Sequence, residues 1–348
     1  MLELETRIRQ AWQGRISGCQ LGKPVETLSM REGYDALAAY LDSVGDRPLR
    51  DYIRFRPRDL LLRQCCRDHL VRSEPDDDIN YSFLTLLMLE QYGVELTTAD
   101  VARTWLRLLP AAKTFTAERA AYRILLQHGA EWFAEGAKPG FDLALCSDNP
   151  YNDWIGAQIR ADLYGWVLPG RPALAAELTR RDAALSHRGD GVHGAVFVAA
   201  LGAAIATQSP AHALRAAQDQ IPEASEAAAA VRLGHELAGD SEGGARIRAR
   251  YAGMSPVHTL NNLAIVVWAL YSHLDDFSAA IGDAVAAGLD TDCNGATVGG
   301  LWGLQGAAIP GHWLTPWQGR VAFSLAGYDE LPVETLVART LALTRRLA

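Results

Sequence analysis

The sequence predicts an all-α protein, and three observations support that prediction. Apolar residues recur at helical spacing along most of the chain, as at Ile8, Trp12 and Ile16. Alternation of period two between turn signals is nearly absent. Alanine clusters such as Ala227 to Ala230 favour helix strongly. Because no repeat of fixed period is detectable, we expect one compact helical domain over residues 1–348 rather than a solenoid.

The same patterns predict individual helices along the chain. An amphipathic, charged segment opens the chain, and an apolar helix follows the first acidic cluster. The later patterns are more apolar or rich in small residues. The segments concerned are Met1 to Gly18, Phe83 to Tyr92, Gly194 to Ala206, Ala230 to Leu237, Leu263 to Tyr271, Gly295 to Ala308 and Val333 to Leu341. Breaks marked by Pro, Gly, Asn or Asp are expected at Gly45 to Pro57, Gly136 to Trp154, Pro169 to Pro172 and Leu314 to Trp317.

Composition narrows the function classes. The 348 residues are 49% hydrophobic and 21% charged, which is typical of a globular protein with a sizeable core. The net charge of −8 and the absence of a basic run argue against nucleic acid as a partner. The longest apolar stretches are too short for a membrane helix, and the N-terminal segment lacks a signal-peptide core. With five cysteines and no disulfide or CxxC pattern, a cytoplasmic protein acting on small molecules is expected.

Two acidic clusters stand far apart in the sequence, each in front of a helical pattern. The first is Glu74-Pro75-Asp76-Asp77-Asp78, and the second is Asp290-Thr291-Asp292-Cys293-Asn294. Acidic residues at a helix start also serve as caps and oppose the helix dipole. Three adjacent carboxylates exceed what one cap uses, however, and burying them is costly unless cations offset their repulsion. The clusters therefore indicate more than capping.

These carboxylates are expected to bind hard divalent cations. Asp76 to Asp78 cannot all face one ion on a regular helix, but at a loop-to-helix junction they can serve two. Asp290 and Asp292 lie two residues apart in chain expected to be extended, so both point the same way. Oxygen ligands without a His or Cys pattern select Mg²⁺, Mn²⁺ or Ca²⁺ over Zn²⁺, and EF-hand spacing is absent. Burying five carboxylates requires roughly four compensating positive charges, which predicts two ions.

These residues resemble a known family. Asp77-Asp78 at a helix start and the run Gly288 to Ala296 resemble the ADP-ribosylglycohydrolase family. The run Gly18-Cys-Gln-Leu-Gly22-Lys-Pro24-Val-Glu26 is similar to the family's glycine-rich motif, which ends in an acidic gate residue. Ser186-His187 followed by Gly194-Ala195 resembles its substrate-contacting histidine region. The resemblance runs from about residue 10 to residue 308 and implies a compact orthogonal helical bundle with a dinuclear magnesium site.

The resemblance also implies roles for individual residues. The implied metal ligands are Asp76, Asp77, Asp78, Asp290 and Asp292. Many members have Thr where Asp76 and Cys293 stand. A thiol is a poor ligand for Mg²⁺, so Cys293 is expected to pack, while one ion relies on Asp76. Glu26 is implied to order or activate water.

Glycines recur beside both of these motifs. Gly18 and Gly22 are expected in a tight loop next to Glu26. Gly295, Gly299 and Gly303 share one helix face, which indicates close packing against another helix, expected to be that of the first cluster.

The segment predicted to contact the substrate resembles the family less closely than the acidic clusters do. The predicted substrate contacts are Tyr151, Trp154, Gly156, Gln158, Arg160, His187 and His193. The aromatic residues can instead be core or rim residues, and the histidines helix-end or loop residues. In ADP-ribose-binding members the preceding loop is rich in Gly and Ser, which cradle the diphosphate. Here Ser147 to Ile155 contains Asp148 and Asp153 but no Gly, Lys or Arg. The phosphate cradle is therefore expected to be weakened.

The predicted function is magnesium-dependent hydrolysis of the anomeric bond of a ribosyl unit. The substrate is expected to be an ADP-ribosylated protein or a small ribosylated metabolite, with Glu26 or Asp77 taking the proton from water. A hydrolase of nucleosides or other small N-ribosides is the alternative that the loop favours. An alternative of another class is a non-catalytic protein that binds ADP-ribose or a metabolite. The clustered aspartates argue against it, since a retired site has no reason to tolerate such charge.

Overall fold

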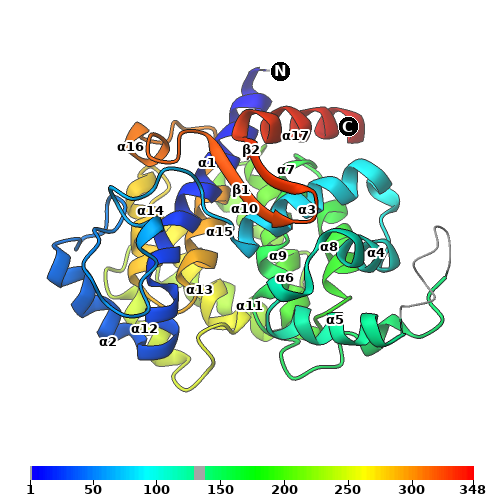
Figure 1. Cartoon of the computed structure of the whole chain (residues 1–348), viewed down its shortest axis with the longest axis horizontal. Coiled ribbons are helices and arrows are strands. Elements are labelled where there is room, and N and C mark those ends of the chain that lie inside the picture. Colours follow the sequence, from blue (N-terminus) through cyan, green and yellow to red (C-terminus); the bar gives the residue numbers. More distant parts are fainter. Residues whose placement is uncertain (1, 129–137) are drawn as a thin grey trace.

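A computed structural model describes residues 2–128 and 138–348, and this part of the chain is mostly helical, which confirms the predicted all-α class (Figure 1). None of the described helices is both long enough and apolar enough to cross a membrane. The helices are α1 (Leu2–Gly22), α2 (Glu26–Val44), α3 (Asp77–Tyr92), α4 (Thr98–Leu108), α5 (Thr116–His128), α6 (Gly156–Ile159), α7 (Asp162–Trp166), α8 (Pro172–Ala183), α9 (Gly189–Ile205), α10 (Pro210–Gln218), α11 (Glu226–Glu236), α12 (Gly243–Arg250), α13 (Thr259–Ser272), α14 (Phe277–Ala286), α15 (Thr291–Gly303), α16 (Gly311–Leu314) and α17 (Val333–Leu347). Short 3₁₀ turns are η1 (Lys23–Val25), η2 (Arg63–Cys65), η3 (Gly93–Glu95), η4 (Ala111–Lys113) and η5 (Leu143–Leu145).

The periodic segments are largely helical, although the helix expected over 295–308 ends at Gly303, and the predicted breaks fall between the observed elements. Gly45 lies in the left-handed region just after α2, as a helix C-terminus favours. The break at 169–172 separates α7 from α8, and the break at 314–317 follows α16. The predicted break at 136–154 begins outside the described residues, and its remainder contains the turn η5 and irregular chain. Local propensity and patterning thus account for most helix ends.

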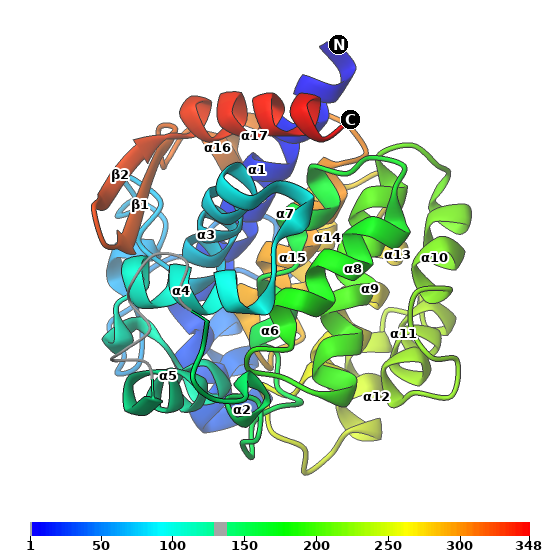
Figure 2. The ribbon, with the colours of Figure 1, turned by 90° about the vertical axis from the view of Figure 1, so that its right-hand side faces the viewer.

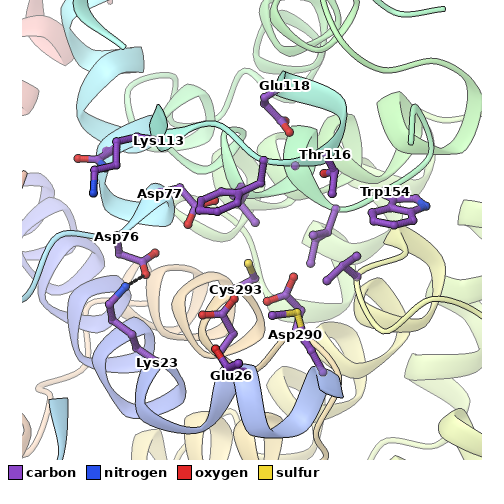
Figure 3. Close-up of a pocket in the computed structure, with 18 of the residues that line it drawn as sticks. Lys23, Glu26, Asp76, Asp77, Lys113, Thr116, Glu118, Trp154, Asp290 and Cys293 are labelled. Atoms are coloured by element: carbon purple, nitrogen blue, oxygen red, sulfur yellow. Dashed lines mark hydrogen bonds and ion pairs between the residues drawn. The ribbon is translucent and has the colours of Figure 1, made fainter. Parts of the chain in front are cut away.

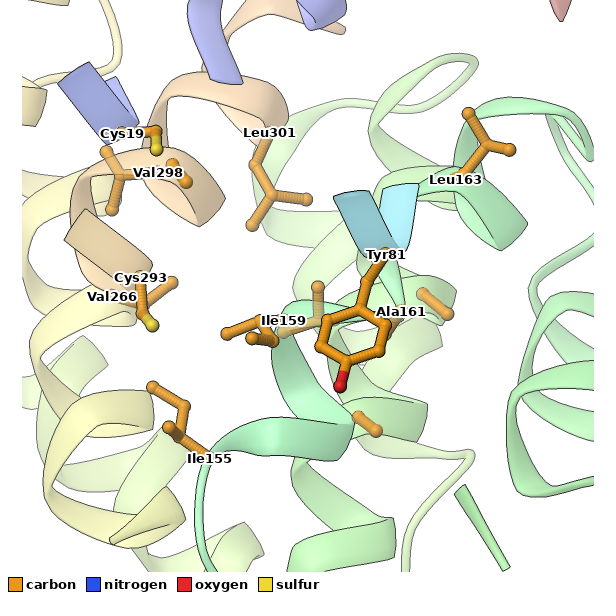
Figure 4. Packing of buried hydrophobic residues seen from close by; sticks show 14 of the residues in the cluster. Cys19, Tyr81, Ile155, Ile159, Ala161, Leu163, Val266, Cys293, Val298 and Leu301 are labelled. Carbon is orange, nitrogen blue, oxygen red and sulfur yellow. The ribbon is translucent and has the colours of Figure 1, made fainter. Parts of the chain in front are cut away.

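The most apolar segments form the centre of the molecule. Helices α9 and α13 are buried on nearly all sides, which explains why their sequences show no polar stripe. One cluster of buried hydrophobic side chains extends from α1 to α17. Part of it packs directly beneath the acidic clusters, where Cys19, Cys293 and Ile159 lie among aliphatic side chains (Figure 4). The carboxylates described below therefore border the core.

A β-hairpin is the one feature of the described fold that the helical prediction misses. Strands β1 (Arg320–Leu325) and β2 (Tyr328–Pro332) pair antiparallel at one edge of the molecule (Figure 2). Their burial does not alternate with period two, because consecutive residues of β1 are buried, so the usual strand signal is absent. The side chain of Asn80 on α3 exchanges hydrogen bonds with the Oγ and the N–H of Ser324, at 2.8 and 3.0 Å. The hairpin thereby braces the first turns of α3.

Helices α1 and α15 cross in contact along a seam of glycines near the centre of the molecule (Figure 1). A Cβ added at Gly18 would lie 1.9 Å from the carbonyl oxygen of Gly295, and one added at Gly299 would lie 2.1 Å from that of Gly14. The predicted close packing at residues 295, 299 and 303 is present. Its main partner is α1, however, and not the helix of the first acidic cluster. Gly18 and Gly22 lie inside α1 and not in a loop, because they are the partners in this seam.

Gly18→Ala is expected to lower the free energy of unfolding by about 3 kcal/mol, because the added methyl group meets rigid backbone that can yield only if the two helices separate. Urea unfolding followed by circular dichroism measures the change. The matched control is Gly311→Ala, since a Cβ at Gly311 meets nothing within 4 Å. Equal stability of the two variants would contradict the tight seam.

Candidate functional site

The site is built where three helix N-termini meet. Glu26 is the first residue of α2, Asp76 caps α3, and Asp290 precedes the first turn of α15. The seam between α1 and α15 determines this meeting, because Gly22 lies against the carbonyl of Thr291 at the point where α1 gives way to η1 and α2. The positive ends of three helix dipoles thus point toward the carboxylates (Figure 3). Two acidic clusters far apart in the sequence become one site.

In the first cluster, Asp76 is fully engaged by protein groups. Its Oδ1 accepts a hydrogen bond of 2.9 Å from the backbone N–H of Asp78, so it is the N-cap of α3. Its Oδ2 forms an ion pair with Nζ of Lys23, drawn as a dashed line in Figure 3. Although burial alone would raise the pKa of Asp76, the ammonium of Lys23 holds it below its ordinary value. Burial likewise opposes the charged form of Lys23, but Asp76 raises the pKa of Lys23 well above its usual range.

Asp78 is buried, and only one of its two carboxylate oxygens has a partner among the described residues. Its Oδ1 lies 3.0 Å from Nη2 of Arg15, whose Nη1 lies 2.8 Å from Oδ2 of Asp162. Its Oδ2 is buried without a hydrogen-bond partner among the residues that the structure describes. Burial raises the pKa of Asp78 well above its ordinary value, although Arg15 opposes the shift. An unpartnered buried carboxylate oxygen is costly, and Asp78 forms a group of close ligand atoms with Asp292 and Cys293 of the second cluster.

The second cluster has a different backbone from the one predicted. Asp290 is the N-cap residue of α15, and Asp292 lies in the first turn of that helix rather than in extended chain. Both side chains are nonetheless brought together. In the described part of the chain, Oδ1 of each is buried with no hydrogen-bond partner. Burial and the neighbouring Asp292 raise the pKa of Asp290 well above its ordinary value, and burial with the charge of Asp76 raises the pKa of Asp292 to about 6.

The described side chains form three groups whose possible ligand atoms lie within 4.8 Å of one another. The group Glu26, Asp290 and Asp292 offers only carboxylate oxygens, and burial together with those two aspartates raises the pKa of Glu26 well above its ordinary value. The other two groups are Asp78, Asp292 and Cys293, and Cys19, Asp76 and Asp78. Asp292 links the first two groups, while Asp77 belongs to none of the three. The orphaned oxygens and hard donor set fit a divalent cation of the Mg²⁺ type around Asp292.

A cavity of about 540 Å³ opens above this cluster (Figure 3). Six of the predicted site residues line it: Glu26, Asp76, Asp77, Asp290, Trp154 and Gly156. Asp78 and Asp292 lie behind that lining, fully buried. A cavity of this size is typical of small-molecule sites. The carboxylates therefore lie where a bound molecule would meet them.

Three predicted substrate contacts face the protein interior instead. Arg160 is buried, with Nη1 2.6 Å from Oε1 of Glu118 and Nε 3.0 Å from Oδ1 of Asp182. Nε2 of His187 accepts from the N–H of Ala157 at 3.3 Å, and burial keeps the pKa of His187 well below its ordinary value. Oε1 of Gln158 accepts from Oγ1 of Thr259 at 3.0 Å. Arg160, His187 and Gln158 are thus bonded to other protein groups and are not among the described residues that line the cavity.

The remaining predicted contacts divide between the cavity and its surroundings. Trp154 lines the cavity, and Tyr151 packs edge-on against it with ring centroids 4.7 Å apart. Nδ1 of His193 lies 3.2 Å from Oδ1 of Asp190, and neither His193 nor Tyr151 is among the described residues that line the cavity. Gly156 has a clear reason to be glycine, since a Cβ there would lie 2.1 Å from Oε1 of Glu118. Trp154 is thus the aromatic residue of this loop that a ligand can reach.

Sequence reasoning missed several residues of the site. Lys23 lies within the glycine-rich motif quoted above, but nothing in the motif indicates that its side chain turns toward Asp76. Lys113, Phe115 and Glu118 reach the cavity from η4 and the start of α5, a segment without a recognisable motif. Phe115 is 53% exposed, which is unusual for a large apolar side chain. Only the fold could reveal these four residues.

Comparisons with known proteins agree with the helical fold. The family model described as ADP-ribosylglycohydrolase matches residues 1–345. A solved structure entitled "ADP-ribosylglycohydrolase-related protein complex" is similar with a TM-score of 0.65 and 22% sequence identity, covering 100% of both chains, and shows the same fold. No curated protein matches the chain. With a family model that spans nearly its whole length, the chain belongs to the ADP-ribosylglycohydrolase family.

Proposed function

We propose that the protein is a magnesium-dependent hydrolase of ribosyl bonds, with Mn²⁺ as a possible substitute. The observation that carries the proposal is the set of buried, unpartnered oxygens on Asp78, Asp290 and Asp292 beneath a cavity of small-molecule size. Buried carboxylates in this arrangement are stable as anions only beside a cation. The family to which the chain belongs supports glycosyl-bond hydrolysis as the reaction.

The residue that would hold the ion is Asp292, together with Asp290 or Asp78, each of which shares a group of close ligand atoms with it. When bound, a hard divalent ion would orient ribose hydroxyl groups and stabilise charge at the anomeric centre. Glu26 lies within 4.8 Å of Asp290 and Asp292, faces the cavity, and is the better placed of the two candidate bases. Its carboxylate would accept the proton of the attacking water, and the oxocarbenium-like centre would meet negative charge. Asp77 lines the same cavity and is the alternative base.

The rest of the cavity suits a ribosyl compound with a planar substituent. The indole of Trp154 and the ring of Phe115 offer apolar faces on which a base or a similar ring can stack. Lys113 and Arg31 also line the cavity and are the cations that an anionic group would meet there. The loop before Gly156 contributes no cation to the lining, as its sequence suggests.

A hydrolase of small N-ribosides without a diphosphate is the second candidate, and one observation favours it. Asp153 lies next to Trp154 and is partly exposed, with its Oδ2 3.2 Å from Nε2 of His258. A diphosphate in the family's usual cradle would meet this charge instead of glycine N–H groups. We therefore expect small ribosides to be cleaved with kcat/KM about tenfold higher than ADP-ribosylated protein, a difference of about 1.4 kcal/mol.

A parallel assay of both substrate classes tests the proposal. Nucleosides and other N-ribosides are compared with proteins ADP-ribosylated on Arg or Ser, at saturating Mg²⁺ and again after chelation. Hydrolysis that stops with chelator supports the proposed function. Equal or better turnover of the ADP-ribosyl substrate would reject the small-riboside candidate. Tight binding of ADP-ribose without turnover of either class would identify the protein as a non-catalytic binder.

A further inference from the structure

Asp76 differs from the other buried aspartates of the site in that each of its carboxylate oxygens already has a protein partner. Its Oδ1 is committed to the N-cap bond with the N–H of Asp78, and its Oδ2 to Nζ of Lys23. The side chains of Lys23 and Asp76 are 13% and 2% exposed, so this ion pair is largely shielded from water. The pair sits inside the acidic site and not on its rim.

The position of Lys23 is determined by the fold. It directly follows Gly22, where an added Cβ would lie 2.2 Å from the carbonyl oxygen of Thr291. It also begins η1, whose next residue, Pro24, restricts the backbone. The main chain of Lys23 is thus held against the first turn of α15, one side chain's length from Asp76. The fold therefore places the ammonium group of Lys23 within the site.

The oxygens without partners lie on the other aspartates. They are Oδ2 of Asp78 and Oδ1 of both Asp290 and Asp292. The group that contains Asp76 consists of the thiol of Cys19, a poor ligand for a hard ion, the already engaged Asp76, and Asp78, which also belongs to a group with Asp292. The carboxylate oxygens around Asp292 are therefore free to bind one hard ion. The oxygens of Asp76 that a second ion would need are already bonded to protein groups.

We propose that the ammonium of Lys23 takes the place of a second divalent ion, so that the cluster binds one Mg²⁺ or Mn²⁺ around Asp292. This inference rests on the proposed function and replaces the two ions expected from the sequence. The charge balance agrees with it. Lys23 pairs with Asp76, and Arg15 is shared between Asp78 and Asp162, so a single divalent ion is left to offset the buried carboxylates of Asp290 and Asp292.

The test counts Mn²⁺ ions bound per chain, by electron paramagnetic resonance of the free ion and by titration calorimetry. The wild type is expected to bind one Mn²⁺ without spin coupling. Lys23→Met frees Asp76 and is expected to bind two, whose coupled spectrum reports ions about 4 Å apart. Lys113→Met is the matched control, because it removes a positive charge from the same cavity without freeing a ligand. It should still bind one.

A second variant keeps the proposal testable if Lys23→Met does not fold. Asp76→Asn retains an oxygen for the N-cap bond and is expected to bind one Mn²⁺ as the wild type does, since Asp76 is not a ligand. Two coupled ions in the wild type, one ion in folded Lys23→Met, or loss of the ion in Asp76→Asn would each overturn the proposal while leaving a metal-dependent hydrolase intact. A wild type that binds no divalent ion would overturn the proposed function and this inference with it.

Discussion

Asp292→Asn is expected to abolish divalent-metal binding and to lower kcat/KM by about 10³-fold, equivalent to about 4 kcal/mol of lost transition-state stabilisation. Asp292 belongs to two of the three groups of close ligand atoms, so its loss removes the ligand that those two groups share. The neutral amide keeps the shape of the side chain but not its charge. Mn²⁺ titration and a ribosyl-hydrolysis assay at saturating Mg²⁺ measure the two effects.

The variant should fold at least as well as the metal-free wild type. Asp292 is buried beside Asp76, Asp290 and the other carboxylates, and removing one of several like charges relieves repulsion. Asp275→Asn is the control, because Asp275 is exposed and remote from the cavity lining. Metal binding by Asp292→Asn with the affinity of the wild type would show that the ion lies elsewhere.

The helices were predictable because their signals are local. The spacing of Ile8, Trp12 and Ile16 requires no knowledge of what α1 packs against. The β-hairpin was missed because its residues are buried by α3 and not by an alternating pattern of their own. The prediction that Gly18 and Gly22 lie in a loop was wrong for a similar reason. Glycine weakens an isolated helix, and only the carbonyl groups of α15 reveal why it is needed there.

The candidate site was predictable only in part. Clustered aspartates carry a signal in the sequence, because burying several carboxylates demands a cation whatever the fold. The orientation of a side chain, by contrast, leaves no such signal in the sequence. Arg160 is a predicted substrate contact, yet its side chain turns inward to Glu118 and Asp182. Lys23 is one residue of a quoted motif, yet it turns toward Asp76. The direction in which such a side chain turns depends on the partners that the tertiary fold places near it.

Glu26→Gln is expected to lower kcat by about 10³-fold while leaving one divalent ion bound, because it removes a base while Asp78, Asp290 and Asp292 keep their buried unpartnered oxygens. Asp77→Asn, made in parallel, is expected to lower kcat by only about tenfold, since Asp77 belongs to none of the described groups of close ligand atoms. Single-turnover kinetics with the best riboside separates the chemical step from binding, and Mn²⁺ titration shows whether the ion is retained.

Glu32→Gln is the matched control for Glu26→Gln, because Glu32 lies on the same helix α2 but is exposed and paired with Arg58. It should behave as the wild type. A larger loss in Asp77→Asn than in Glu26→Gln, with metal retained in both, would assign the base to Asp77. Loss of the ion in Glu26→Gln would make Glu26 a ligand, which its place within 4.8 Å of Asp290 and Asp292 permits geometrically. The two readouts together therefore distinguish a base beside the ion from a ligand of it.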